Sequence, residues 1–321
     1  MTIDVRIPAA ILTATAAFAS CGTTTVPGDA SETSSAGTST RRVVLDPDQD
    51  YGDEYADGVL PVGDDRYVTA KAKKGYVFAC ATYAQQLSGG GGGGAQLPGP
   101  WFSDDLTTYD IDEKATVSGS VSWPAENSVT TRSGKRIITT NDLPEHTTGT
   151  YPVSASDDAY EYDRNPNSIS EQDITLVVTR KPTYGAPQCM GGQVGVMTTG
   201  AELFNAFDAG GRDAGAWEVQ DDCGGHPQMQ GAYHYHTLSA CIGTTRTTKV
   251  IGWALDGFPI TGPKVSKGNI LTTKDLDVCH GLTSKVRIGG RKVTTYHYVM
   301  TQDFPYSVSC FRATPVTTGP V

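Results

Sequence analysis

The chain of 321 residues has no extended basic run, no apolar run long enough to span a membrane as a helix, and no Cys-x-x-Cys pair. The net charge is −10 at pH 7, so nucleic acid and anionic membrane surfaces are poor partners, because neither would be neutralised. Without Cys-x-x-Cys spacing, neither a zinc knuckle nor a thioredoxin-like redox centre is expected.

Motifs of several common functional classes are also missing. The chain has no Gly-x-Ser-x-Gly elbow, so serine hydrolysis has no support. The six glycines at residues 89–94 are not followed by the Lys-Ser/Thr of a phosphate loop, and we expect a flexible loop between strands there. The segment around Asp208 and Asp213 lacks the closing glutamate of a calcium loop, so it predicts a turn.

Composition and punctuation favour β structure. The chain has 37 glycines and 18 prolines, and no helix longer than about three turns is convincing. We therefore predict an all-β, disulfide-stapled sandwich or barrel-like fold with a few short helical turns, placed at Ala201–Phe207 and Gly215–Val219. The predicted strands are Ala115–Trp123, Ile137–Thr140, Ile174–Thr179, Gln193–Met197, Gly231–His236, Lys249–Trp253, Lys285–Ile288 and Lys292–Thr301.

The first 21 residues resemble a bacterial lipoprotein signal. The apolar stretch Ile7–Ser20 ends at Cys21, and Phe18-Ala19-Ser20-Cys21 is similar to a lipobox whose cysteine is lipidated after cleavage. This predicts an extracytoplasmic protein anchored to the cell membrane through Cys21, with secretion as the alternative. Residues 22–65 are expected to form a disordered, acidic tether, 66–114 an N-terminal β segment that contains the glycine loop, and 115–314 the main domain.

Six further cysteines agree with export, because an even number in an exported protein suggests disulfides. The sequence alone permits 15 connectivities. Spacing favours Cys223–Cys241 and Cys279–Cys310, which leaves Cys80–Cys189 as the third pair.

Two tyrosine–histidine stretches, Tyr233–His236 and Tyr296–Tyr298, give the most specific indication of chemistry in the sequence. Successive side chains of a strand alternate between faces, so His234 and His236 share one face and can reach one metal ion. His226 and His297 would complete three or four nitrogen ligands, with His280 as a weaker candidate. Zinc is the default expectation because it is abundant. Copper is favoured where all the ligands are imidazoles and the protein lies outside the cytoplasm.

A second interpretation makes the same histidines hydrogen-bonded structural residues. Glu218 and Asp222 are weak candidates for a general base beside a metal-bound water, although they more often orient ligating histidines. The two stretches also look like an internal pair. If they pack side by side, His297 would approach His234 and His236.

Blocks of residues across 117–313 resemble the bacterial YHYH-domain proteins. The resemblance identifies the main domain and implies no settled activity. One departure is Thr261, where the family usually has an aromatic residue after Phe-Pro-Ile. The matching blocks are Asn141–Pro144, Tyr162–Ile169, Phe204–Asp208, Gly211–Ala214, Glu218–Asp221, Gly225–Pro227, Tyr233–His236, Asp256–Ile260, Tyr296–Tyr298 and Phe304–Tyr306 with Cys310.

These observations predict an exported lipoprotein with a histidine-rich zinc or copper site, whose reaction, if any, the sequence does not name. The alternative is a non-catalytic cell-surface module, with structural histidines, that binds a cell-envelope glycan or a protein. Convergence of at least three histidine ring nitrogens on one point favours the metal site, since ligand bonds to zinc are about 2.0–2.1 Å long.

Overall fold

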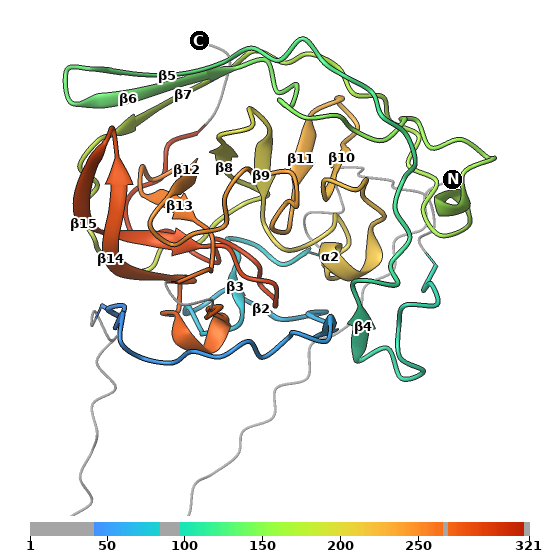
Figure 1. Ribbon diagram of the computed structural model, residues 1–321, viewed down its shortest axis with the longest axis horizontal. Helices are drawn as coiled ribbons and strands as arrows, with labels where there is room; N and C mark the ends of the chain where they lie inside the picture. Colours follow the sequence, from blue (N-terminus) through green and yellow to red (C-terminus); the bar gives the residue numbers. More distant parts are fainter. Residues whose placement is uncertain (1–41, 84–96, 266–268, 318–321) are drawn as a thin grey trace, which may run out of the picture. The chain divides into compact units, whose positions relative to one another are not determined.

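The computed structural model describes residues 42–83, 97–265 and 269–317 (Figure 1). The predicted signal with Cys21, the tether up to residue 41 and the glycine loop at 89–94 lie outside these residues. No helix in the described ranges is long and apolar enough to cross a membrane.

Strands dominate, as predicted, and they form open sheets, since the described residues contain no closed barrel. The short helices are η2 (Asp158–Glu161), α2 (Ala214–Trp217) and η4 (Thr273–Asp275). The strands are β1 (Val59–Pro61), β2 (Tyr67–Val68), β3 (Val77–Phe78), β4 (Thr108–Asp110), β5 (Asn127–Arg132), β6 (Lys135–Thr140), β7 (Ile174–Thr179), β8 (Gln193–Met197), β9 (Glu202–Phe204), β10 (Gly225–Pro227), β11 (Tyr233–Tyr235), β12 (Val250–Ala254), β13 (Pro259–Thr261), β14 (Gly281–Ile288) and β15 (Arg291–Val299).

An eight-stranded mixed sheet is built from two halves with the same topology. Its order is β10-β11-β9-β8-β12-β13-β15-β14, and β8 and β12 meet antiparallel at its centre. Outward from that pair, each half has an antiparallel neighbour (β9 or β13) and then a parallel one (β11 or β15). An antiparallel strand (β10 or β14) ends each half. The halves are thus related by a pseudo-two-fold axis between β8 and β12.

The turns repeat as well. β8 and β12 begin 57 residues apart, at 193 and 250, and so do β9 and β13, at 202 and 259. Each hairpin turns at a glycine with positive φ, Gly200 at 97° and Gly257 at 89°, where a side chain would be strained. The backbone bond from Met197 to residue 201 measures 2.9 Å, and its counterpart from Ala254 to residue 258 measures 3.0 Å.

Matching aspartates anchor the outer strands of each half. Asp221 accepts backbone N–H bonds from the residues two and four positions later, at 2.9 and 3.2 Å, and the hydroxyl of Tyr233 at 2.9 Å. Asp277 makes the same three contacts, at 2.9 and 3.1 Å, and with Tyr296 at 2.9 Å. The internal pair suggested by the sequence is therefore a structural repeat.

A three-stranded antiparallel sheet, β5-β6-β7, runs past the larger sheet (Figure 1). Its inner face is apolar, with Ile138, Leu176 and Val178 each at most 1% exposed. The turn between β5 and β6 falls at Ser133 and Gly134, both with positive φ, and β5 was not among the predicted strands.

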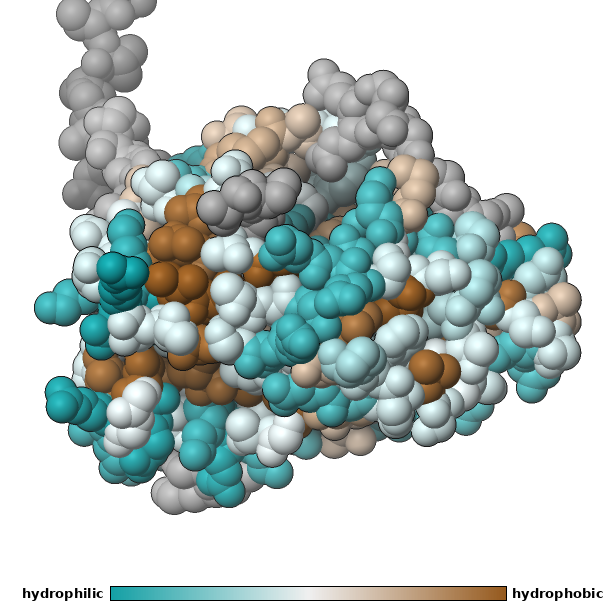
Figure 2. All heavy atoms as spheres, turned by 90° about the horizontal axis from the view of Figure 1, so that it is seen from above, coloured by the Kyte–Doolittle hydropathy of each residue, from teal (hydrophilic) through white to brown (hydrophobic). Residues whose placement is uncertain are grey.

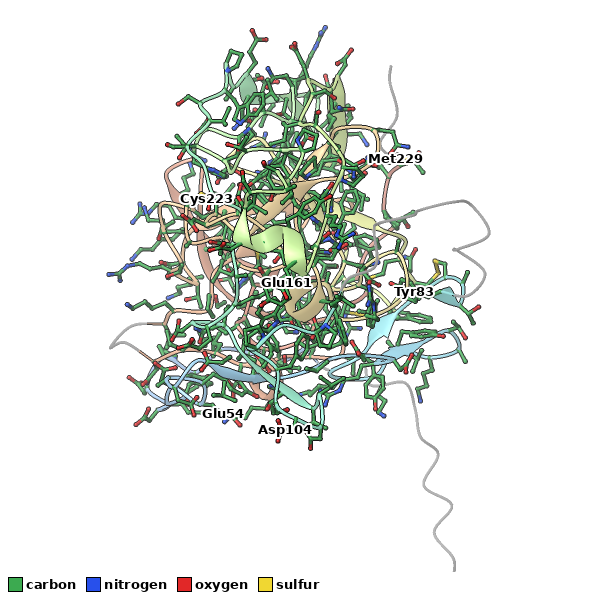
Figure 3. The ribbon with its side chains drawn as sticks, turned by 90° about the vertical axis from the view of Figure 1, so that its right-hand side faces the viewer. Glu54, Tyr83, Asp104, Glu161, Cys223 and Met229 are labelled. Carbon is green, nitrogen blue, oxygen red and sulfur yellow. A yellow bond between two sulfur atoms is a disulfide. The ribbon has the colours of Figure 1, made fainter. Side chains whose placement is uncertain are left out.

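Residues 42–65 are not a tether. Leu60 is 1% exposed in a second core cluster, and β1 pairs with β4. Val44 bridges to Thr283 of β14. The prediction failed because it weighed the acidic side chains and not the few apolar ones between them. Glu54 of this segment lies on the lower side of the view in Figure 3, as does Asp104.

Two further local predictions were wrong. Ala115–Trp123 forms only isolated bridges, from Val117 to Asp221 and from Val121 to Thr148. Ala201–Phe207 contains strand β9 in place of a helical turn, because residues 202–204 pair with both β8 and β11. The turn expected at Gly215–Val219 corresponds to α2, one residue earlier.

Three disulfides staple the fold. Cys223–Cys241 and Cys279–Cys310 are the pairs that spacing favoured, and Cys80–Cys189 is the pair that remained. The first two flank the outer strands of the two halves. The tyrosines of both Tyr-His-Tyr stretches lie between them in one hydrophobic core. Three disulfides suggest an extracytoplasmic protein.

Candidate metal centre

Three histidines converge at the outer end of the first half-sheet. β10 and β11 pair antiparallel with His226 opposite His234, and His236 follows two residues after His234 on the same face. Tyr233 and Tyr235 point to the opposite face, into the main core. One ring nitrogen from each histidine lies within 4.8 Å of the other two, and all three side chains are buried.

Backbone carbonyls determine which ring nitrogens face the centre. Nδ1 of His236 donates to the carbonyl oxygen of Asn205, and Nδ1 of His234 donates to that of Ala232 at 3.2 Å. A carbonyl oxygen only accepts, so both Nδ1 atoms carry a proton and each neutral ring presents a bare lone pair at Nε2. The two Nε2 atoms lie 3.1 Å apart. Two lone pairs at this distance repel unless a cation lies with them.

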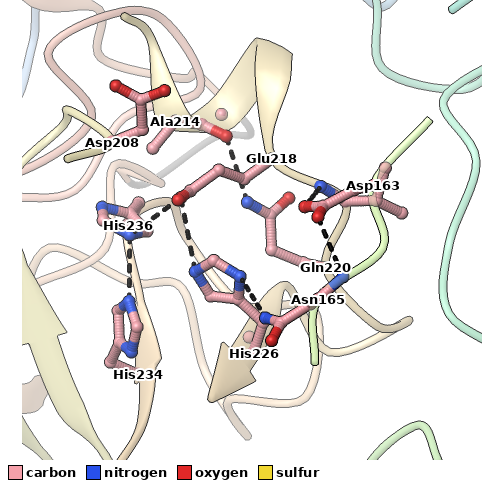
Figure 4. A network of polar contacts seen from close by, with 12 residues as sticks. Asp163, Asn165, Asp208, Ala214, Glu218, Gln220, His226, His234 and His236 are labelled. Carbon is pink, nitrogen blue, oxygen red and sulfur yellow. Dashed lines mark hydrogen bonds and ion pairs between the residues drawn. The ribbon is translucent and has the colours of Figure 1, made fainter. Parts of the chain in front are cut away.

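Glu218 supplies a negative charge to the cluster (Figure 4). It follows α2, and its Oε2 lies 3.3 Å from Nε2 of His226 and 3.2 Å from Nε2 of His236. Within the described residues, neither Oε2 of Glu218 nor Nε2 of His226 has a hydrogen bond of good geometry. The carboxylate of Glu218 therefore remains able to bind a cation. Nε2 of His226 would bind one only after losing the proton that it carries when Asn165 donates to Nδ1.

The charges of this cluster are strongly coupled. Burial would raise the pKa of Glu218, but His226 and His236 outweigh it and lower that pKa to about 2. Burial would likewise lower the pKa of His226, but Glu218 outweighs it and raises that pKa. For His234, burial and then the neighbouring histidines hold the pKa well below its usual value. Burial also lowers the pKa of His236.

The surroundings hold the ligands in place. The ring of Phe204 on β9 stacks on His234, with centroids 4.1 Å apart and planes 27° apart. Lys114 donates to the backbone carbonyl of Glu218 at 2.7 Å and to the side chain of Gln220 at 2.6 Å. Burial lowers the pKa of Lys114 to about 8. Asn165 approaches Nδ1 of His226 at 3.5 Å and donates to a neighbouring carbonyl at 3.0 Å.

His297 does not join this cluster, although we predicted it as a ligand. It lies on β15, with four strands between β15 and β11, so the two strands are about 24 Å apart at the usual strand spacing. Its Nδ1 contacts the hydroxyl of Thr261 and its Nε2 that of Ser284, both at 2.8 Å. The paired stretches therefore lie near opposite ends of the sheet, and the expectation that they pack side by side is wrong.

Two weaker candidates also lie elsewhere. His280 is buried, with Nε2 at 3.0 Å from the hydroxyl of Thr301. It occupies the position that Gly224 has in the first half, and both residues have positive φ, 67° and 73°. Asp222 is exposed and accepts from Thr116 at 2.7 Å, away from the histidines.

The three convergent histidines and Glu218 were predicted from the sequence, whereas the residues that orient them were not. The carbonyls of Asn205 and Ala232 have no side-chain signature. Phe204 and Asn205 stood in a matching block without a role, and nothing in the local sequence linked Lys114 to Glu218, 104 residues later.

His146, which was not singled out, lies on the opposite face beside Tyr235, to which its Nε2 is hydrogen-bonded. It is also within 4.8 Å of the sulfurs of Cys223 and Cys241. Because those cysteines form a disulfide, they offer no thiolate to a metal.

Comparison with known proteins places the centre within one family. No curated protein and no solved structure matches the chain. The family described as YHYH protein matches residues 175–273, a segment that contains β8 to β13, Glu218 and the three convergent histidines. The chain therefore carries a YHYH protein family domain over these residues.

Proposed function

We propose that this protein is an exported, membrane-anchored metal-binding protein that holds zinc or copper at His226, His234 and His236. One observation carries the proposal. The Nε2 atoms of His234 and His236 face each other at 3.1 Å while both Nδ1 atoms donate to carbonyls.

A metal ion resolves this arrangement better than a shared proton does. Burial lowers the pKa of both His234 and His236, so a protonated pair is disfavoured. Two nitrogens bound tetrahedrally to one zinc ion lie about 3.3 Å apart, given bonds of 2.0–2.1 Å. The observed 3.1 Å is close to that spacing. The contacts of Glu218 at 3.2 and 3.3 Å fit the same scale and make it a candidate fourth ligand.

Imidazole nitrogen suits both zinc and copper, and a carboxylate beside it adds charge that favours either dication. When bound, such an ion supplies Lewis acidity, or redox chemistry in the case of copper. The chain's own residues orient the rings through the carbonyls of Asn205 and Ala232, and Phe204 packs on the ring of His234. Neither the orientation of the rings nor the packing of Phe204 indicates a particular reaction. The proposed function is therefore metal binding alone.

Metal content of the mature chain tests the proposal. The chain from residue 22 onward, with its disulfides formed and without an affinity tag of histidines, is compared with His234→Ala/His236→Ala. The matched control is His297→Gln, which changes the equivalent histidine of the second half. We expect about one zinc or copper per chain in the wild type and the control, and none in the double variant. Absence of metal from the wild type after incubation with either ion and dialysis would overturn the proposal.

Membrane anchoring through Cys21 is part of the proposal and rests on the lipobox-like sequence. Mass spectrometry of the N-terminal peptide from the producing cell tests it. A diacylglycerol on Cys21 supports anchoring, whereas a cleaved, unmodified N-terminus indicates secretion.

The alternative, a surface module with structural histidines, has partial support. Both ring nitrogens of His297 contact hydroxyls, and His280 contacts one. That description does not extend to the first half of the sheet, where His234 and His236 face each other.

A further inference from the structure

Arg136, on β6, is a buried cation without a counter-charge. Its side chain lies over the ring of Trp253, 3.2 Å from the centroid, and the residue is 4% exposed. Its Nη1 is buried and has no hydrogen-bond partner among the described residues. Arginines that are removed from water are normally paired, because an unpaired buried charge costs several kcal/mol, by a rough estimate.

A second positive charge lies on the same strand pair. Arg136 lies opposite Val178 in the ladder, and Arg180 follows two residues later, with its N–H bonded to the carbonyl of Gly134 at 3.0 Å. Burial lowers the pKa of Arg136 to about 10, and the charge of Arg180 lowers it further. Neither arginine forms an ion pair with a carboxylate among the described residues.

The surroundings extend this positive region. In the segments 127–141, 174–201, 223–255 and 278–302 there is no acidic residue, although the whole chain has a net charge of −10. Arg132 lies opposite Lys135 at the tip of one hairpin, and Arg287 lies opposite Lys292 at the tip of another. Like charges placed directly across a ladder destabilise it, so strand pairing does not explain them.

The second hairpin is connected to the same strand as the indole. Arg287 bridges to Lys249, which directly precedes β12, and β12 carries Trp253. Seen from above, hydrophilic side chains lie beside strips of apolar ones on this face of the molecule (Figure 2). Basic residues from distant segments therefore lie at the tips of two hairpins, although no basic run joins them in the sequence.

We propose that Arg136, Arg180 and Trp253 form a binding site for a phosphate-type oxyanion. Such an ion offers several acceptor oxygens, which match the fixed fork of donors on a guanidinium, and the paired arginines supply opposite charge. The surrounding lysines and arginines raise its local concentration. A free oxyanion and the phosphate of an anionic lipid headgroup present the same chemistry, so both are sources to be tested. The site is separate from the histidine cluster and does not depend on a metal.

The test uses the mature chain with its disulfides intact and inorganic phosphate as the probe. Thermal unfolding and tryptophan fluorescence are followed as phosphate replaces chloride at constant ionic strength. We expect saturable stabilisation and a fluorescence change. Arg136→Met keeps the aliphatic contact with Trp253 and removes the charge, and should weaken phosphate binding at least about tenfold. Arg180→Gln, at an exposed position, should weaken it about threefold.

Arg164→Gln is the matched control, because Arg164 is an exposed arginine placed over Tyr160 at 5.1 Å in another part of the chain. It should bind phosphate as the wild type does. Vesicles of anionic and of neutral phospholipid distinguish the sources. Binding to anionic vesicles that Arg180→Gln weakens assigns the site to headgroups, and an effect of phosphate alone assigns it to a free oxyanion. If neither phosphate nor anionic vesicles bind the wild type, or if Arg180→Gln and Arg164→Gln behave alike, the proposal is wrong.

Discussion

The two halves of the large sheet share a scaffold and differ in what it carries. Aspartate, cysteine, glycine and both tyrosines recur at matching positions of the outer strands. His226 and His236 do not recur, since Leu282 and Val299 stand in their places. The aspartate, cysteine, glycine and tyrosines that the halves share hold the strands, whereas two of the three candidate histidine ligands are present in the first half alone.

The one histidine common to both halves shows the same division. His234 packs its ring on Phe204, whereas His297 contacts the hydroxyl of Thr261, which stands at the matching position. A second hydroxyl, of Ser284, occupies the other nitrogen of His297. The departure at Thr261 noted in the sequence thus marks the half in which the histidine is structural.

The largest expected difference concerns the two anchoring aspartates. Asp277 also forms a buried ion pair with Arg312 at 2.7 Å, and Asp221 has no such partner among the described residues. We expect Asp277→Asn to lower the free energy of unfolding by about 4 kcal/mol. Asp221→Asn should lower it by about 2 kcal/mol. Urea denaturation measures both, with the exposed Asp222→Asn as control. Equal losses would show that the ion pair adds nothing.

The next effect is a pH dependence of stability in the second half. Burial lowers the pKa of His297 to about 4, from a usual value of about 6.5. Between these values the unfolded chain binds a proton that the folded chain does not. The contribution is therefore complete above pH 6.5 and is lost as the pH falls towards 4, by about 3 kcal/mol.

His297→Gln should flatten the dependence of the unfolding free energy on pH in this window. The comparison is made in the His234→Ala/His236→Ala background, so that release of metal does not contribute. An unchanged slope would show that His297 titrates alike in the folded and unfolded chains.

Matching glycines should be equally intolerant of a side chain. A Cβ on Gly225 would lie 2.3 Å from the ring of Tyr233, and one on Gly281 would lie 2.4 Å from the hydroxyl of Tyr296. Gly225→Ala and Gly281→Ala should each cost about 2 kcal/mol by overpacking. Gly191→Ala is the control, because its Cβ would meet nothing within 4 Å. Thermal unfolding measures the three, and a cost confined to one half would break the equivalence.

The smallest effect is expected at Thr261. Thr261→Val keeps the side-chain shape and removes the bond to Nδ1 of His297, at a cost of about 1 kcal/mol. Metal content should not change, because the first half carries the candidate ligands. Denaturant unfolding together with metal analysis checks both points, and a loss of metal in this variant would contradict the division between the halves.

The sequence predicted the character of this fold better than its layout. Alternation and turn residues located β7, β8, β12 and the β14–β15 hairpin. Spacing favoured two of the disulfides, and the third followed by elimination. The order of the strands in the sheet could not be predicted from the sequence, because the parallel pairing of β11 with β9 and of β15 with β13 depends on contacts between distant segments. Strand β9 was misread because three residues are too few to show a period.

The candidate site was predictable only in part, for a similar reason. His234 and His236 share a face by strand geometry alone, and His226 joins them through a short hairpin. His297 lies in an equally clear Tyr-His-Tyr motif. The motif does not show that four strands separate β15 from β11 in the sheet. Orientation by the carbonyls of Asn205 and Ala232 leaves no trace in residue type.

The placement of β10 and β14 at the two ends of the large sheet has a consequence for self-association. β10 is three residues long and ends at Pro227, which has no N–H to offer another chain. β14 is longer, but its exposed positions include Lys285 and Arg287, and Val44 and Lys249 bridge to it. Short, charged or covered edge strands are poor templates for β-addition. Neither edge of this sheet is therefore expected to pair with a strand from another copy of the chain.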